Sequence, residues 1–398
     1  MKIGILTFHW VYNFGANLQT CSTYYNILAR KHTPLIINWI PEDDEVFQKK
    51  ITSENQASVH TLFFKEMSCT RLCRNDKDIA DVITEEQIDC IIIGSDAVWN
   101  ILKPRLSRST LKKIIPFSNH VFPNPFWGSF KQYLKKDVPL ATLSVSNQNA
   151  NYKKYKSSRK EIGTSIRSFT YISVRDVYTK KMVQYFCEKC NPPITPDPVF
   201  SFNTAVQIPS KDYIMQKYNL PEKYVLFSFN KHRSFKDSYL NNLIAFFERN
   251  GYCSVNLKKI IGNKSIKTEK FIPSEISPID WYSIIKYSSG YIGVLMHPIV
   301  VSLHNNVPFF AFDTYGKEKF FLFRDKKTSK TYDIVSRAQL LKNYHSCDYV
   351  HSLPNPAQVF DSIVNFEIEK SIAFSKKKEG EYSECLDAII ESFENALH

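Results

Sequence analysis

His297 is the residue of this chain best placed to bind an anion or to transfer a proton. Pro298 follows it directly, and proline is favoured in the first turn of a helix, so we expect His297 at a helix N-terminus. Unpaired backbone N–H groups and the helix dipole attract an anion at that position. A protonated imidazole there could bind phosphate or donate a proton. A hydrogen-bonded core histidine is the alternative that the residues leave open.

Further polar residues recur where a predicted strand gives way to a loop or a helix. Ligands of open α/β sheets bind at the carboxyl ends of the strands, so this pattern predicts a binding site. Taken singly, Asp96 could be only a helix cap, Arg175 a surface ion pair and Lys231 a solvated loop charge. The whole set is His9, Asn13, Gln19, Ser95, Asp96, Arg175, Asn230, Lys231, Arg233 and His297.

The first thirty residues show the pattern most fully. A short apolar strand at 3–6 runs into a polar and aromatic loop, and helical spacing of apolar residues returns from Ala16. His9, Asn13 and Gln19 surround this loop together with Gly15. Gly15 alone would suffice to turn the chain, so the other polar types indicate ligand binding rather than a simple connection.

The elements that must position these residues alternate between strands and helices. We expect strands at 3–6, 34–40, 89–94, 138–145 and 169–174, then at 224–229, 258–261, 290–295 and 307–312. Buried apolar strands that alternate with helices indicate parallel sheets. Residues 41–45 are predicted to form an acidic turn, and residues 357–374 and 383–398 two helices.

This pattern predicts an α/β protein with two Rossmann-like domains that face a cleft. A chain of 398 residues suits two domains better than one. We expect an N-terminal domain over 1–200, a C-terminal domain over 201–370, and a helical segment over 371–398 that crosses back to the first domain. The prolines between 192 and 198 stiffen the connection and mark the boundary.

Composition narrows the classes of partner and compartment. With 43% hydrophobic and 23% charged residues, the chain is typical of globular proteins. The formal net charge of +13 raises nucleic acid as a partner, but the basic residues are spread out and no nucleic-acid motif appears, so we expect none. No apolar run is long enough for a membrane helix. We therefore expect a cytoplasmic protein that at most touches the inner face of a membrane.

Neither the cysteines nor the motifs argue for a metal ion or a cofactor. The nine scattered cysteines, including the CxxC pair Cys187 and Cys190, are predicted to be reduced thiols. GxGxxG, Walker and HExxH motifs are absent. Asp76-Lys77-Asp78 resembles the DxD of some glycosyltransferases, but its polar surroundings predict a solvated loop.

Five blocks of the sequence combine into a family pattern. They are KIGILTFHWVYNFGANLQT, DCIIIGSDAVWN, YISVRD, PDPVF and GVLMHPIVVSLHNNVPFFAFDTYG. In this order they resemble the polysaccharide pyruvyl transferase family over most of the chain. The resemblance implies a two-domain fold like that of the GT-B glycosyltransferases. It also implies transfer of a pyruvyl group from phosphoenolpyruvate onto two hydroxyls of a sugar in a cell-surface or exopolysaccharide precursor, which gives a ketal and phosphate.

By matching position, the resemblance implies that Arg175 and His297 handle phosphoenolpyruvate. Many members carry an Arg two residues before this His, where the present chain has Leu295. An apolar side chain cannot grip a carboxylate or a phosphate. Arg175, Lys231 or Arg233 must then take the role, or donor binding is weaker.

Ketal formation calls for a general acid, a base and cations that hold the anions. His297 and Asp96 are the candidates for acid and base, with Arg175 and Lys231 as the clamp. The expected donor-binding set is Arg175, Asn230, Lys231, Arg233 and His297, and the expected acceptor-binding set is His9, Asn13, Gly15, Gln19, Ser95 and Trp99.

The implied partners are phosphoenolpyruvate and a sugar or lipid-linked oligosaccharide. The long basic loop at 103–135 is the candidate contact for such an acceptor near a membrane surface. Two other functions stay open on the sequence. One is a GT-B glycosyltransferase that uses a nucleotide sugar, and the other is a glycan-binding relative without catalysis.

Overall fold

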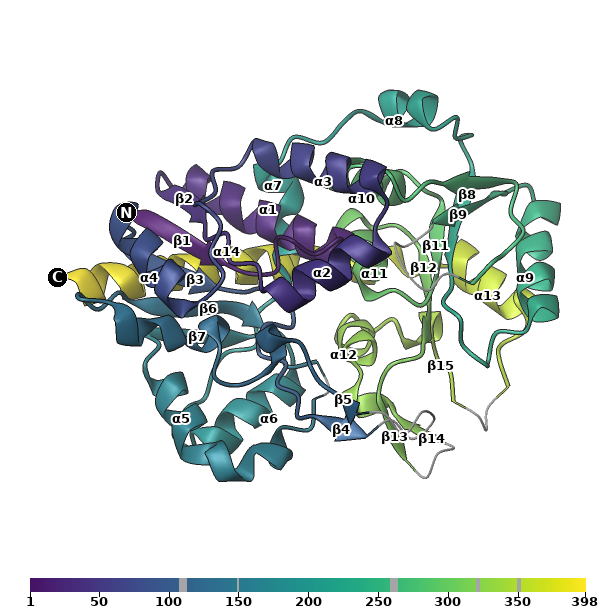
Figure 1. Cartoon of the computed structure of the whole chain (residues 1–398). Helices are drawn as coiled ribbons and strands as arrows, with labels where there is room; N and C mark the ends of the chain where they lie inside the picture. The colour runs from purple at the N-terminus through teal and green to yellow at the C-terminus, as the bar shows by residue number, and fades with distance from the viewer. Residues whose placement is uncertain (107–112, 149, 258–263, 320–322, 349–351) are drawn as a thin grey trace. The chain divides into compact units, whose positions relative to one another are not determined.

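The chain divides into two compact units, each built on one parallel sheet (Figure 1). The computed structural model describes residues 1–106, 113–148, 150–257, 264–319, 323–348 and 352–398. Unit 1 comprises Met1–Ile51, Phe64–Val206 and Gly380–His398. Unit 2 comprises Thr52–Phe63 and Gln207–Glu379. The chain passes from unit 1 into unit 2 at Val206, a few residues beyond the prolines that mark the expected boundary.

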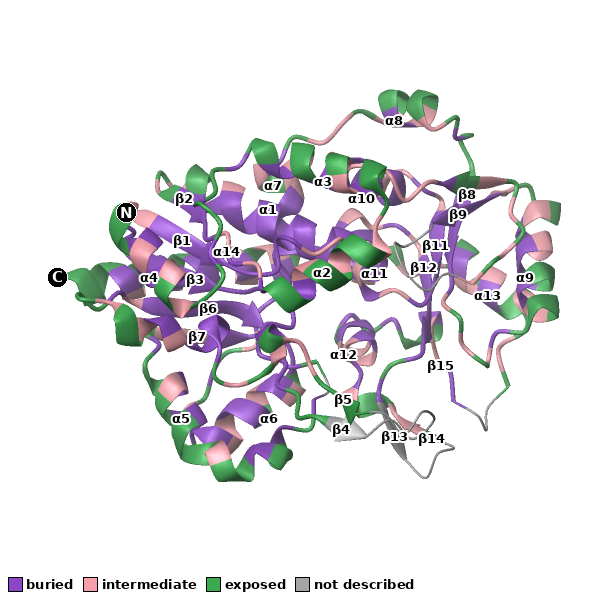
Figure 2. Cartoon of the chain, in the orientation of Figure 1, coloured by how far each residue is buried: buried purple, intermediate pink, exposed green. Residues whose placement is uncertain are grey.

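Unit 1 holds a five-stranded parallel sheet in the order β2-β1-β3-β6-β7. Its strands are β1 (Lys2–Leu6), β2 (Thr33–Ile36), β3 (Cys90–Ile93), β6 (Leu140–Val145) and β7 (Tyr171–Val174). All four residues of β3 and all six of β6 are buried, which fits strands covered on both faces. Figure 2 shows this sheet almost wholly in the colour of buried residues.

The helices of unit 1 are fixed at their starts by polar caps. Asn13 caps α1 (Phe14–Ala29) by accepting from the Gly15 N–H, and Asp176 caps α6 (Val177–Phe186) by accepting from the Thr179 N–H. Such caps satisfy backbone donors that the helix itself cannot pair. The other helices of this unit are α2 (Glu42–Ile51), α4 (Asp76–Glu85), α5 (Arg159–Arg167) and the short α7 (Phe202–Ala205).

Unit 2 holds a six-stranded parallel sheet in the order β10-β9-β8-β11-β12-β15. Its strands are β8 (Tyr224–Ser228), β9 (Cys253–Leu257), β10 (Lys270–Ile272), β11 (Gly290–Gly293), β12 (Phe309–Asp313) and β15 (Tyr344–Ser346). A small antiparallel pair, β13 (Lys317–Lys319) and β14 (Phe323–Asp325), follows β12. The helices are α8 (Lys211–Lys217), α9 (Asp237–Arg249), α10 (Pro278–Lys286), α11 (Met296–Asn305), α12 (Lys330–Arg337) and α13 (Pro356–Val364).

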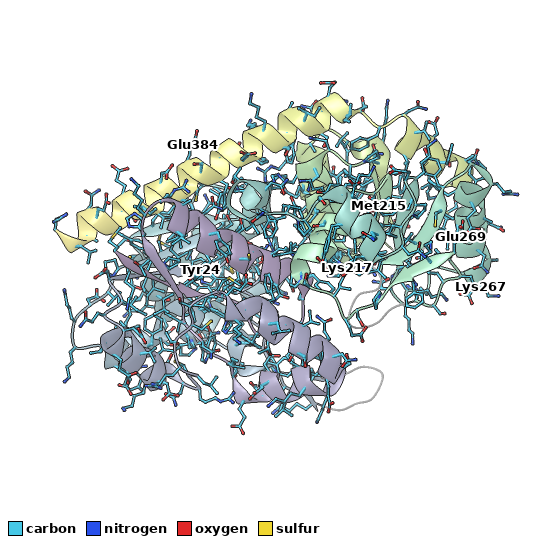
Figure 3. The ribbon with its side chains drawn as sticks, turned by 90° about the horizontal axis from the view of Figure 1, so that it is seen from above. Tyr24, Met215, Lys217, Lys267, Glu269 and Glu384 are labelled. Carbon is cyan, nitrogen blue, oxygen red and sulfur yellow. A yellow bond between two sulfur atoms is a disulfide. The ribbon has the colours of Figure 1, made fainter. Side chains whose placement is uncertain are left out.

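The C-terminal helix α14 (Ile368–Leu397) runs for 30 residues without a break. Its residues up to Glu379 belong to unit 2 and those from Gly380 to unit 1, so the expected crossing of this segment is confirmed. In unit 1 the Arg30 guanidinium binds Asp387 at 2.6 Å. Figure 3 shows α14 as one continuous helix with Glu384 labelled on it. The helix expected at 357–374 covers α13 and the start of α14, and the gap expected before 383 lies inside α14.

Several other expectations differ from the structure. The acidic stretch at 41–45, expected to be a turn, leads into α2, and Asp76-Lys77-Asp78, expected to be a loop, begins α4. Carboxylates in the first turn stabilise a helix through its dipole. The strand expected at 258–261 lies outside the described residues, and the strand before it, β9, ends at Leu257. Helices α3 (Glu54–Lys65) and α5 were not expected at these bounds.

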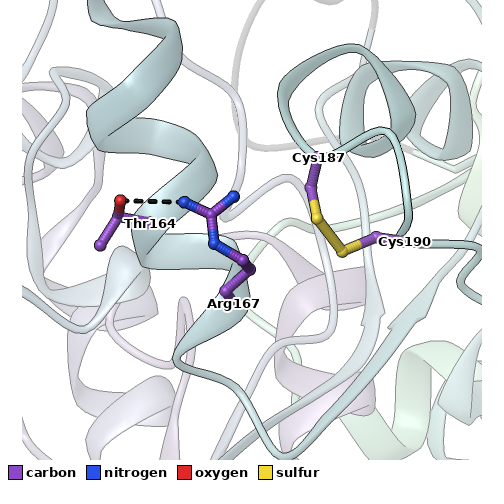
Figure 4. The surroundings of a disulfide bond; sticks show 4 residues. All are labelled: Thr164, Arg167, Cys187 and Cys190. Atoms are coloured by element: carbon purple, nitrogen blue, oxygen red, sulfur yellow. Dashed lines mark hydrogen bonds between the residues drawn. A yellow bond between two sulfur atoms is a disulfide. The ribbon is translucent and has the colours of Figure 1, made fainter.

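Cys187 and Cys190 form a disulfide, so the expectation of reduced thiols is wrong for this pair (Figure 4). Cys187 is the C-cap of α6, and the three-residue separation lets both sulfurs meet across the helix end. Nearby, Arg167 donates to the Thr164 hydroxyl at 3.1 Å. The other seven cysteines are free: Cys21, Cys69, Cys73, Cys90, Cys253, Cys347 and Cys385.

The described residues contain neither a membrane-spanning helix nor a cluster of metal ligands. Over these ranges no helix has both the length and the apolar character needed to cross a bilayer. Within the same residues no three His, Cys, Asp or Glu side chains gather where they could bind a metal ion.

Candidate functional site

In unit 1 a buried charge cluster lies at the carboxyl ends of three neighbouring strands. Asp96 follows β3 and Arg175 follows β7, on either side of β6. The Arg175 guanidinium binds Asp197 at 3.0 Å and Asp96 at 3.5 Å. Only 4% of the Arg175 side chain, 11% of Asp96 and 1% of Asp197 is exposed. The structure thus joins two of the predicted catalytic residues through an ion pair.

Asp197 is the member of this cluster that sequence reasoning missed. It caps the short 3₁₀ turn at Pro198–Ser201 by accepting from the Val199 N–H, and it also accepts from the Gln19 side chain at 2.5 Å. Its signal in the sequence is the block PDPVF, which the resemblance quotes without assigning a function to Asp197. Asp197 therefore connects Gln19 of α1 with Arg175, the first residue after β7.

The charge state of this cluster follows from its carboxylates. Burial by itself lowers the pKa of Arg175, but the charges of Asp197, Asp96 and Asp176 outweigh it and raise the pKa above its ordinary value. Arg175 therefore stays protonated. Since two of these carboxylates already bind the guanidinium, its first role in this structure is to hold Asp96 and Asp197 in place.

Asp96 has a backbone conformation that few residues adopt. Its φ is 73°, in the left-handed region that Asp tolerates better than most side chains. The conformation is held because the Ser146 N–H donates to the Asp96 carbonyl at 2.8 Å. The neighbouring Ser95 donates its hydroxyl to the Ser144 carbonyl and accepts from Thr7. These bonds direct the Asp96 carboxylate toward Arg175.

His9 is held in the loop between β1 and α1. Its Nε2 lies 2.9 Å from the Asn38 side-chain oxygen, and its Nδ1 lies 3.3 Å from the Thr7 carbonyl. Burial lowers the pKa of His9, although these two bonds oppose the shift. A histidine with a lowered pKa is neutral near pH 7, so it can donate or accept a hydrogen bond but adds no charge.

The remaining acceptor candidates divide by exposure. Asn13 is exposed as the cap of α1, Gly15 is buried beside it, and Gln19 and Ser95 make the internal bonds described above. Trp99, also expected to contact the acceptor, does not reach the surface in this structure. It is fully buried, its ring stacks on Trp127 at 4.6 Å, and its Nε1–H donates to the Phe126 carbonyl.

In unit 2 the helix α11 begins at the carboxyl end of β11. His297 is its second residue, as the following Pro298 predicted. The N-cap is Leu295, which makes no side-chain cap hydrogen bond, so no side chain there satisfies the first N–H groups. Gly293 lets β11 approach β8, since a Cβ at this position would lie 2.4 Å from the Ser228 carbonyl oxygen. The helix start is thereby held against the end of β8.

The loop after β8 brings the other predicted donor residues to the same edge. Lys231 and Arg233 are exposed, and with His232 they line a hollow of about 420 Å³. Its remaining lining residues are Asp237, Lys264 and Ser265, of which Lys264 and Asp237 form an ion pair. The lining carries more positive than negative charge and suits an anionic ligand.

The carboxyl end of β12 lies on the same side of the sheet and carries further polar residues. Asn230, after β8, donates to the Thr314 hydroxyl at 3.4 Å. Asp313 is fully buried, and it accepts from Tyr344 at 2.7 Å and from the Tyr315 N–H at 2.8 Å. Burial raises the pKa of Asp313, while these bonds and the nearby Arg324 charge oppose the shift. A second polar edge is thus formed within unit 2.

Two Rossmann-like units with strand-end polar sites define the GT-B fold class. The spinosyn forosaminyltransferase SpnP, for example, is 7% identical with a TM-score of 0.52 and covers 99% of both chains. The match extends to UGT2 of Phytolacca americana in complex with UDP-2-fluoro-glucose and pterostilbene, at 12% identity and a TM-score of 0.55, over 99% of each chain. UDP-GlcNAc 2-epimerase from Neisseria meningitidis matches at 8% identity and a TM-score of 0.57, over 98% of this chain and 99% of that one.

Within that class the sequence decides the family. The family model for polysaccharide pyruvyl transferase matches residues 13–315, which is more than half of the chain. This chain therefore belongs to the polysaccharide pyruvyl transferase family, as its five sequence blocks predicted. No curated protein matches it, and identities of 12% or less to the solved structures named above show the fold alone.

Proposed function

We propose that the protein transfers a pyruvyl group from phosphoenolpyruvate onto two hydroxyls of a sugar in a polysaccharide precursor. The observation that carries the proposal is the start of α11. There an N-terminus without a side-chain cap presents His297 at the end of β11. Lys231 and Arg233 follow β8, the strand that pairs with β11. Membership of the pyruvyl transferase family supports the same reaction class.

The donor carries a phosphate and a carboxylate, and unit 2 offers donors of hydrogen bonds to both. Backbone N–H groups at a helix start bind anions through hydrogen bonds and the helix dipole. Lys231, Arg233 and His232 line the 420 Å³ hollow, which is large enough for a three-carbon phosphate ester. We assign His297, Asn230, Lys231 and Arg233 to the donor.

The reaction balances with one acid and one base. His297 gives a proton to the methylene carbon of phosphoenolpyruvate, so the C2 carbon becomes electrophilic. One sugar hydroxyl attacks C2 and loses its proton to a base. The second hydroxyl then attacks C2 and gives its proton to His297, which restores the acid. The C–O bond to phosphate breaks, and phosphate leaves with the proton that the base had taken. Asp96, held by Arg175 in unit 1, is the candidate base, with His9, Asn13 and Gly15 as acceptor contacts.

This scheme requires neither a metal ion nor a bound cofactor. Phosphoenolpyruvate is a cytosolic metabolite, and we place the reaction in the cytoplasm on that ground. For a lipid-linked acceptor, the described residues of the segment 103–135 offer exposed basic and apolar side chains. Lys103 and Lys113 are exposed, and Ile115 is 71% exposed. Such a pairing suits an anionic membrane surface.

The function is tested first by ligand binding and then by phosphate release. Ligands that bind only the folded state raise the melting temperature, so phosphoenolpyruvate should raise it and UDP-sugars should not. The reverse result would instead support a nucleotide-sugar glycosyltransferase. With an acceptor present, His297→Ala should reduce phosphate release by about 10²-fold or more, the usual scale for a proton-transfer residue.

A matched control separates this effect from misfolding. His398→Ala removes an exposed histidine at the end of the described chain and should leave phosphate release unchanged. If His297→Ala keeps full activity in a folded protein, the start of α11 is not the donor site.

A further inference from the structure

The N-cap of α11 carries no guanidinium group that could bind an anion. Leu295 occupies the N-cap and packs against the core of unit 2, so it cannot bind a carboxylate or a phosphate. Lys231 and Arg233 stand in an exposed loop, where a charged side chain holds an anion less firmly than at a half-buried position. The described side chains around the ends of β8, β11 and β12 include one further guanidinium, that of Arg324.

Arg324 reaches the strand-end edge from the β13–β14 pair. It lies in β14 and is half-buried. Its Nη2 is 3.4 Å from Nε2 of His232, which lines the 420 Å³ hollow, and its Nη1 donates to the Gly316 carbonyl at 3.4 Å. Arg324 therefore connects the segment after β12 to the loop after β8.

The sheet order places β11 between these two ends. In unit 2 the order is β8-β11-β12. The bond from Asn230 to Thr314 and the contact from His232 to Arg324 both join the β8 side to the β12 side. They must pass over the end of β11, where α11 begins. Arg324 is accordingly on the carboxyl-end side of the sheet, where α11 also begins.

The strand register supports the same placement. Gly293 pairs with Ala311 at the end of β11, and Asp313 is the last residue of the neighbouring strand β12. Asp313 feels the charge of Arg324, which acts to lower the pKa of this carboxyl. The guanidinium is thus near the end of β12, the strand beside β11.

We propose that Arg324 is the cation that grips the anionic donor at the start of α11, in the place that Leu295 leaves without a charge. The ligand class is a small phosphorylated carboxylate, whose planar carboxylate fits the two parallel N–H groups of a guanidinium. The proposal rests on the proposed function, because it deepens the same donor site.

The experiment is calorimetric titration of phosphoenolpyruvate into the full chain and its variants. Arg324→Ala should raise the Kd by about 10- to 100-fold, the range for loss of a charge-assisted contact. Arg324→Lys should recover only part of this loss, since an ammonium is a point charge. Lys327→Ala is the matched control, because it removes the same charge from an exposed position three residues away and should leave the Kd unchanged.

A second variant keeps the test independent of folding. Leu295→Arg in the Arg324→Ala background should restore binding if the two positions serve one anion. Equal Kd values for the wild type and a folded Arg324→Ala protein would overturn the assignment, as would equal losses in Arg324→Ala and Lys327→Ala. UDP-sugar and inorganic phosphate are titrated in parallel. Binding of UDP-sugar alone overturns the proposed function, and its loss in Arg324→Ala would still place Arg324 at the anion site. Binding of none of the three anions overturns both.

Discussion

Arg175 shows how much of a buried residue's surroundings the sequence leaves open. It is expected to clamp the donor, and in this structure its guanidinium binds Asp197 and Asp96 with 4% of its side chain exposed. The sequence could place Arg175 at a strand end, because YISVRD is a plain apolar strand followed by charge. It could not pair Arg175 with Asp197, since that contact depends on the path of the loop that follows α6.

Arg175→Ala should therefore destabilise the protein as well as affect the donor. Removing one partner of a buried ion pair leaves an uncompensated charge and costs about 3–5 kcal/mol. Urea unfolding measures this loss. Arg159→Ala is the control, because its pair with Glu188 is exposed on both sides and such pairs are worth at most about 1 kcal/mol. A loss in Arg175→Ala no larger than in the control would show that the cluster is not structural.

His304 should make the stability of unit 2 sensitive to acid. Burial and the charge of Lys286 lower its pKa from 6.5 to about 4. Between pH 6.5 and about 4, His304 is therefore protonated in the unfolded chain and neutral in the folded chain. The free energy of unfolding consequently falls as the pH drops through this range. Melting temperatures across this range should fall less in His304→Gln than in the wild type. Parallel curves for the two proteins would assign the acid sensitivity to other groups.

At the scale of elements, the two polar edges depend on how closely neighbouring strands approach. Strand and helix types were predicted well where Gly or Pro marks one end of an apolar run, as at Gly94 after β3, Gly293 in β11 and Pro298 in the first turn of α11. The prediction failed where a helix lacked an apolar stripe, as at α2. It also divided α14 in two, because charge masked its continuity. Local pattern decides an element, while tertiary packing decides its ends.

Gly293 and Gly380 should respond oppositely to the same substitution. Gly293→Ala should lower the melting temperature, because its Cβ would lie 2.4 Å from the Ser228 carbonyl oxygen and push β11 from β8. Gly380 lies inside α14, where an added methyl group would meet nothing within 4 Å, so Gly380→Ala should stabilise by about 0.5–1 kcal/mol. Thermal unfolding of both variants checks the two predictions. An unchanged melting temperature for Gly293→Ala would mean that β8 and β11 can move apart without loss of stability.

At the scale of the whole molecule, the sequence predicted the fold class and the family more readily than the site. Two α/β units follow from repeated strand and helix signals, and the fold is confirmed by the solved structures. The last part of the C-terminal helix belongs to unit 1, as expected. The strand-end residues do gather at the carboxyl ends within each unit. Their partners, Asp197 in unit 1 and Arg324 in unit 2, come from loops and a short hairpin that carry no periodic signal.

The division of the chain has a consequence for biosynthesis. Unit 1 contains Met1–Ile51 and also Gly380–His398, and the latter segment supplies four side chains with no exposed surface, Tyr382, Leu386, Ile389 and Phe393. A ribosome makes these residues only after the whole of unit 2. Most of unit 1 is therefore synthesised before unit 2, but its core is completed only after unit 2 has been made. Until α14 leaves the exit tunnel, the apolar surface of unit 1 that α14 covers stays exposed and can bind chaperones.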